Sequence, residues 1–148
     1  MGELLKLEPR GNAMVLALVA HDAKKDDMLE LARAHVDQLR RMELLATSTT
    51  GTILMQEVGL QVERSASGPQ GGDLQIAALI SAGRVDAVIF LRDPLTSHPH
   101  EPDIQALLKV CDIYSVPLAT NLASAHILLE HLSRPEPEPA AQLSAAGC

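Results

Sequence analysis

The stretch that decides the fold is MVLALVAHD, residues 14–22. Its first seven residues are all apolar, and this lack of alternation predicts a strand that is covered on both faces. His21 and Asp22 end the strand. The residues that follow recur at the spacing of one helix face, which predicts an amphipathic helix after Asp22: Met28, Leu31, Ala32, His35 and Leu39.

The same alternation of strand and helix continues to residue 132. Further strands are expected at residues 42–46, 61–65, 87–91 and 116–119, with 61–65 near an edge of the sheet. Helices are expected at about 49–58, 73–82, 104–111 and 121–132. Because parallel strands need helical crossovers, this order predicts an α/β domain with a five-stranded, mostly parallel sheet. The domain is expected to span 1–132, and the Pro-, Glu- and Ala-rich residues 133–148 to form a flexible tail.

Length and composition narrow the class of protein. A chain of 148 residues is expected to form one domain, and its 47% hydrophobic content can supply a full core. Nineteen acidic residues against twelve basic ones leave a net charge of -7, and Phe90 and Tyr114 are the only aromatic residues. Nucleic acid is therefore not an expected partner, because it selects for positive charge and, when single-stranded, for stacking rings.

Cysteine usage and hydropathy bear on location. Cys111 and Cys148 do not resemble the dense disulfide framework of a small secreted protein. The N-terminal segment has charges within its apolar residues, so no secretory signal is expected. No apolar run approaches the roughly 18 residues of a membrane span. We therefore expect a cytoplasmic protein without a membrane partner.

Polar segments follow every expected strand. In open α/β sheets, ligands bind outside the carboxyl ends of the strands. The polar segments are therefore expected to meet along one edge of the sheet. They comprise residues 21–22, 47–51, 67–73, 92–103 and 120–121.

Four hydroxyl residues precede Gly51 where a helix is expected to begin: Thr47, Ser48, Thr49 and Thr50. Hydroxyls and free N–H groups at a helix N-terminus suit a phosphate group, although one Ser or Thr there is also an ordinary N-cap. Because no Lys follows the glycine, the segment is not a P-loop. Lys25 could supply the missing positive charge, or it could be a surface lysine.

Residues 67–73, SGPQGGD, form a glycine-rich turn that ends in a carboxylate. The absence of GxGxxG argues against dinucleotide binding. The glycines would let the backbone approach a ligand closely. Asp73 could cap the helix that follows, or it could act as a general base held by a rigid turn.

Residues 98–103, HPHEPD, are the densest titratable cluster in the chain. Three interpretations stay open: a divalent metal site, an imidazole that polarises a carbonyl group, and a solvated loop stiffened by proline. No second pair of ligands at zinc spacing supports a metal, so no metal is expected.

Taken together, the motifs LVAHD, ATSTTG, SGPQGGD, FLRDPL, PHEPD and PLATN resemble methylglyoxal synthase in order, spacing and sequence over about residues 16–132. The resemblance implies a doubly wound, three-layer α/β/α fold. It also implies a lyase without a cofactor, which converts dihydroxyacetone phosphate into methylglyoxal and inorganic phosphate through an enediolate. A homohexamer and inhibition by inorganic phosphate are further implications of the resemblance.

The resemblance also assigns roles to residues. Asp73 would abstract the C3 proton and His100 would polarise the substrate carbonyl, with Asp103 as a further catalytic carboxylate. Asp22 and Asp93 would support these groups. Ser48 stands where the family usually has glycine, so a left-handed backbone there would cost energy. The residues implied in substrate binding are His21, Lys25, Thr47, Ser48, Thr49, Thr50, Ser67, Gly68 and His100.

The alternative function is a non-catalytic regulatory module of the same fold that binds an effector or phosphate. Asp73, His100 and Lys25 are all present, which favours the enzyme over the module.

Overall fold

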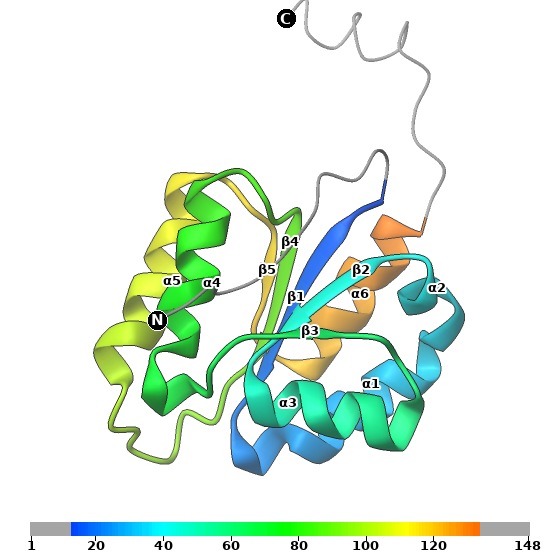
Figure 1. Cartoon of the computed structure of the whole chain (residues 1–148), viewed down its shortest axis with the longest axis horizontal. Helices are drawn as coiled ribbons and strands as arrows, with labels where there is room; N and C mark the ends of the chain where they lie inside the picture. The colour runs from blue at the N-terminus through cyan, green and yellow to red at the C-terminus, as the bar shows by residue number, and fades with distance from the viewer. Residues whose placement is uncertain (1–12, 134–148) are drawn as a thin grey trace, which may run out of the picture.

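The fold is a five-stranded sheet covered by helices on both faces, as seen in a computed structural model that describes residues 13–133 (Figure 1). All neighbouring strands are parallel, in the order β3-β2-β1-β4-β5. The prediction of a doubly wound α/β domain is confirmed. The strands are β1 (Val15–Ala20), β2 (Glu43–Ala46), β3 (Glu63–Arg64), β4 (Ala87–Leu91) and β5 (Leu118–Ala119).

The helices divide between the two faces of the sheet. Helices α4 and α5 cover one face, and α1, α2, α6 and the π-helical turn η2 cover the other (Figure 1). Their bounds are α1 (Lys25–Ala34), α2 (Val36–Arg40), α3 (Ser48–Ile53), η2 (Leu54–Val58), α4 (Gly72–Ser81), α5 (Glu101–Ile113) and α6 (Leu122–Leu132), with short 3-10 turns η1 (Asp22–Lys24) and η3 (Gly68–Gln70). No helix within residues 13–133 is both long and apolar enough to cross a membrane.

The unbroken apolar run of β1 is explained by this three-layer arrangement. Leu16 and Leu18 belong to the core on the α1 and α6 side, whereas Ala17 and Val19 belong to the core on the α4 and α5 side. Successive side chains of a strand point to opposite faces. A central strand with helices on both faces therefore needs apolar residues at every position.

Two helices differ from their sequence-based expectation. The helix expected after Asp22 is interrupted at His35, whose φ of -121° leaves the helical range and whose ring nitrogen bonds that of His126 at 2.9 Å. The helix expected at 49–58 begins as α3 and continues as the π-helical turn η2, which ends at Gly59 with φ +78°. Both irregularities depend on local geometry rather than on apolar spacing. The expected tail lies outside the described residues, apart from Ser133.

The strand order places a ligand site at the middle of the sheet. From β1 the chain moves to β2 and β3 on one side, and then crosses back to β4 and β5 on the other. The neighbouring ends of β1 and β4 are therefore a topological switch point, where the connections diverge and leave a crevice. Residues Ala20 and Leu91 pair at this end, so the segments that begin at His21 and Arg92 border the crevice.

Gly72, at the first turn of α4, permits a close approach that no other residue would allow. A Cβ at this position would lie 1.9 Å from the carbonyl oxygen of Ala66. We expect Gly72→Ala to lower the free energy of unfolding by about 1–3 kcal/mol, because the backbone would have to shift. Urea unfolding tests this. Ala78→Ser, on the exposed side of the same helix, should change the value by less than about 0.5 kcal/mol, and an equally small effect of Gly72→Ala would contradict the close approach.

Candidate active site

A cavity of about 540 Å³ lies at the carboxyl ends of the central strands. Its walls come from four segments that are distant in sequence: the end of β1, the start of α3, the turn before α4 and the loop between β4 and α5. Ten residues named from the sequence line it: His21, Asp22, Lys25, Thr47, Thr49, Ser67, Gly68, Asp73, Asp93 and His100. Four of the five polar segments therefore meet as expected, whereas neither Thr120 nor Asn121 lines the cavity.

Asp73 is the buried carboxylate of the cavity. The residue is 0% exposed, and among the described residues neither carboxylate oxygen has a hydrogen-bond partner. The N-cap of α4 is Gly71, with no side-chain cap bond, so Asp73 does not serve as the cap. Burial raises the pKa of Asp73 above its ordinary value, with His100 acting in the opposite direction. A desolvated carboxylate without partners is a stronger base than a solvated one.

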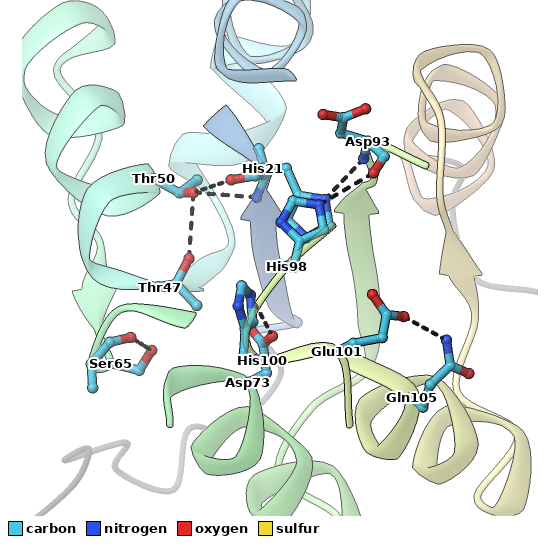
Figure 2. A network of polar contacts seen from close by, with 12 residues as sticks. His21, Thr47, Thr50, Ser65, Asp73, Asp93, His98, His100, Glu101 and Gln105 are labelled. Atoms are coloured by element: carbon cyan, nitrogen blue, oxygen red, sulfur yellow. Dashed lines mark hydrogen bonds and ion pairs between the residues drawn. The ribbon is translucent and has the colours of Figure 1, made fainter. Parts of the chain in front are cut away.

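His100 is the imidazole that faces this base. Its Nε2 lies 3.6 Å from Oδ2 of Asp73, and Figure 2 shows the two side chains facing each other. The ring also lies against the backbone of Gly68, where an added Cβ would be 2.8 Å from Nε2. Asp103, one turn into α5, does not line the cavity, but its charge raises the pKa of Asp73. Asp103 therefore acts on Asp73 through its charge and not as a lining residue.

His21 is held in one defined state. Its Nδ1 accepts a hydrogen bond of 2.9 Å from the backbone N–H of Asp93, which places the proton of the neutral ring on Nε2. Burial first, and then repulsion from His98, His100 and Lys25, lower the pKa of His21 to about 4. At neutral pH the ring is therefore an uncharged donor. Among residues 13–133, its Nε2 has no partner.

His98 was not singled out from the sequence as a site residue, yet it lines the same cavity. Its ring stacks on that of His21 with centroids 3.8 Å apart (Figure 2). The dense titratable cluster at residues 98–103 was the signal that contained it, but sequence alone could not say which imidazole faces which neighbour. Thr96, Ser97 and Pro69 also line the cavity. They lie in polar segments that were expected to meet there, but none of them was named as a site residue.

The hydroxyl segment divides into two pairs. Thr47 and Thr49 line the cavity, whereas Ser48 and Thr50 do not. The hydroxyl of Thr50 is fully buried, accepts a hydrogen bond from the N–H of Ala20 at 3.2 Å and lies 3.4 Å from its carbonyl oxygen. Ser48 is the first residue of α3 and is not among the described residues with positive φ, so the backbone cost expected for it does not arise. The cradle predicted from four hydroxyls presents two of them to the cavity.

Lys25 supplies the positive charge at the cavity wall. Its Nζ donates to the carbonyl oxygen of Ala20 and lies 3.7 Å from a carboxylate oxygen of Asp22, whose side chain is fully exposed. Burial lowers the pKa of Lys25, and Asp22 acts against this shift. Lys25, Thr47 and Thr49 together form a cationic, hydroxyl-lined wall that suits an anion.

No group of three or more His, Cys, Asp and Glu residues within 13–133 is arranged to hold a metal ion. The cluster at residues 98–103 instead directs His98 and His100 toward His21, with which both rings make aromatic contacts.

The site belongs to a chain with close relatives. Residues 27–120 match the family described as the MGS-like domain. Relatives named methylglyoxal synthase from Ralstonia nicotianae and Cupriavidus pinatubonensis are each 57% identical over 124 residues, which is 84% of this chain and 92% and 95% of the relatives. A crystal structure of methylglyoxal synthase from Elizabethkingia anophelis matches with a TM-score of 0.75 and 34% identity, covering 85% of this chain and 94% of that one.

Burying the Asp73 carboxylate without a hydrogen bond lowers the free energy of unfolding at neutral pH, and a substitution can measure this effect. The pKa of Asp73 is raised in the folded state, so folding favours the protonated carboxyl group. The contribution of Asp73 to stability is therefore fully present below the unfolded pKa and is lost as the pH rises through the folded pKa. We expect Asp73→Asn to have a higher Tm than the parent at pH 8, by about 2–4 °C for each 1 kcal/mol of relief.

The gap in Tm should narrow as the pH falls, because the parent carboxylate then becomes neutral as well. Asp112→Asn, at an exposed position in α5, makes the same change in net charge and should leave Tm almost unchanged. A Tm of Asp73→Asn equal to or below that of the parent at every pH would contradict the account of Asp73.

Proposed function

Because the chain belongs to the methylglyoxal synthase family, we propose that it is a carbon–oxygen lyase that converts dihydroxyacetone phosphate into methylglyoxal and inorganic phosphate. The observation that carries this proposal is the approach of His100 to Asp73, with Nε2 3.6 Å from Oδ2. Asp73 is buried, and within the described residues its oxygens accept no hydrogen bond. The same cavity is lined by the cationic hydroxyl wall. The reaction needs a base, an electrophile and a phosphate site, and residues whose chemistry suits each of these roles line one cavity.

The first step is proton abstraction. Asp73 takes a proton from C3 of the substrate, the C–H electron pair forms a C2–C3 double bond, and the carbonyl π electrons move to O2. Negative charge then develops on O2, and donors that are already in place stabilise it without reorganisation. His100 polarises the carbonyl, and the Nε2–H of the neutral His21 is available as a second donor.

The second step is elimination. The 3-hydroxyl loses its proton, a C3–O double bond forms, the C2–C3 electron pair moves between C1 and C2, and the C1–O bond to phosphate breaks. The enolate that remains takes up a proton at C1, which becomes the methyl group of methylglyoxal, while a lone pair of O2 re-forms the C2 carbonyl. No electron is gained or lost overall.

The conformation of the phosphate decides whether elimination occurs. The C1–O bond breaks readily only when it stands perpendicular to the plane of the enediolate, because its antibonding orbital then overlaps the π system. Lys25, Thr47 and Thr49 come from different segments than Asp73, and Ser67 and Gly68 lie on the wall that precedes Asp73. We assign to the cationic hydroxyl wall the role of holding the phosphate out of the plane. Ser48 and Thr50 would support this wall from behind.

The proposal has further parts beyond the two catalytic steps. Inorganic phosphate is expected to inhibit, because product and substrate share the cationic hydroxyl wall. We further propose a homohexamer, a cytoplasmic location, and a domain that ends near residue 132. Asp22 would orient Lys25, Asp93 would orient His21 through its backbone N–H, and Asp103 would tune Asp73.

The decisive assay measures methylglyoxal and phosphate release from dihydroxyacetone phosphate by the purified protein after treatment with a chelator. We expect equal amounts of both products, and Asp73→Asn should lower kcat by at least about 10³-fold, the middle of the range for a general base. Asp112→Asn is the charge-matched control and should retain the parent rate. Tight binding of the phosphate ester without turnover would support the regulatory module instead.

The cationic hydroxyl wall makes a separate prediction. Lys25→Met should raise the KM for dihydroxyacetone phosphate and the inhibition constant of inorganic phosphate together, each by about tenfold or more, because a charge-assisted hydrogen bond is lost. Lys24→Met removes the same charge from a neighbouring residue that does not line the cavity, so both constants should stay close to the parent values. A change in kcat alone would place Lys25 elsewhere in the mechanism.

A further inference from the structure

The proposed reaction leaves one cavity residue without a role. His98 is half-buried, lines the cavity, and contacts His21 face to face, with ring centroids 3.8 Å apart and planes inclined by 23°. Its ring also lies 5.6 Å from that of His100. An imidazole that contacts two rings proposed to meet substrate is not explained as a solvated loop residue.

The backbone of Asp93 connects the two stacked rings. Its N–H donates to Nδ1 of His21 at 2.9 Å, and its carbonyl oxygen accepts from Nε2 of His98 at 3.3 Å. The Asp93 side chain folds this loop by accepting the N–H of Leu95 at 3.1 Å. One peptide segment therefore fixes both imidazoles in a single arrangement.

His21 is confined on its remaining sides as well. Phe90, the last but one residue of β4, meets the ring edge-on with centroids 5.1 Å apart and an interplanar angle of 74°. A ring with a single hydrogen bond could still rotate about it. The stacked face of His98 and the edge contact of Phe90 both oppose such a rotation and hold Nε2–H in its observed orientation.

We propose that His98 is a positioning residue: its ring, stacked on His21, holds the Nε2–H of His21 in the orientation that meets the developing oxyanion. This inference rests on the proposed function, because it assigns His21 an oxyanion to meet. The stack carries the effect, since the hydrogen bond of His98 to Asp93 is long at 3.3 Å and serves to place the ring.

The charge of His98 affects the same residue. His98, His100 and Lys25 all lower the pKa of His21 by repulsion, and Asp93 raises it. Replacing His98 with an uncharged side chain should therefore raise the midpoint of the His21 titration above about 4, whichever uncharged side chain is chosen. Positioning and charge can thus be separated by two variants.

Two variants of the full-length protein separate the contacts of His98. His98→Phe keeps a flat ring for the stack and loses the hydrogen bond to Asp93. His98→Gln keeps a hydrogen-bond donor and loses the ring. Ser97→Ala, at the adjacent exposed and cavity-lining position, controls for disturbance of the loop, and thermal unfolding checks that each variant folds.

The first readout is ¹⁵N NMR of the histidine rings, which reports tautomer and titration without any turnover. All three proteins should keep the His21 proton on Nε2, because the Asp93 N–H sets the tautomer. The His21 ring resonances should be single and sharp in the parent and His98→Phe, and broadened or doubled in His98→Gln, where the ring is free to rotate. Both variants should show the raised His21 midpoint, and Ser97→Ala should match the parent. A single, sharp set of His21 ring resonances in His98→Gln would overturn the proposal.

The second readout is the kinetics of methylglyoxal release. His98→Gln should lower kcat by on the order of tenfold, as expected for a donor displaced from its working position, with KM changed by less than about threefold because the lost contact acts in the transition state. His98→Phe should recover most of the lost kcat. Equal loss in both variants would show that the stack is not the positioning contact. If the parent itself makes no methylglyoxal, the proposed function fails, and the NMR result still decides whether His98 positions His21.

Discussion

The hydrogen bond from the N–H of Asp93 to Nδ1 of His21 joins the ends of the two central strands, and the site depends on it. It lies where β1 and β4 run side by side and their connections diverge. Through this bond, the loop after β4 is tied to the end of β1, which also brings His98 and His100 to the cavity. The bond fixes the tautomer of His21 as well, so one contact links the topology of the sheet to the chemistry at its edge.

Besides the Nε2–H donor of His21, the cavity holds a carboxylate that destabilises the fold, Asp73. Asp73 is 0% exposed, and within the described part of the chain its oxygens accept no hydrogen bond. Such a carboxylate opposes folding, and the two cores that pack on either face of the sheet outweigh it. The same burial makes Asp73 a stronger base. The neutral His21 and the raised pKa of Asp73 have the same origin, because burial disfavours the charged form of both.

Much of this arrangement could be predicted from the sequence, because apolar runs and helical spacing report burial directly. The five strands, the edge position of β3 and the meeting of four of the five polar segments are confirmed. The break at His35 and the stacking of His98 could not be predicted. Each depends on a ring that is distant in sequence: His126 for His35, and His21 for His98. Thr50 shows the same limit: a hydroxyl motif does not reveal which hydroxyl bonds the neighbouring strand.

The most direct test of the account is a crystal structure of the protein with a phosphorylated analogue of the enediolate bound. The account predicts that the enediolate oxygen lies within hydrogen-bond distance of His21 Nε2 and His100, that Asp73 lies over the carbon from which the proton is taken, and that Lys25, Thr47 and Thr49 hold the phosphate out of the enediolate plane. An in-plane phosphate, or an analogue whose oxygen contacts neither imidazole, would contradict it.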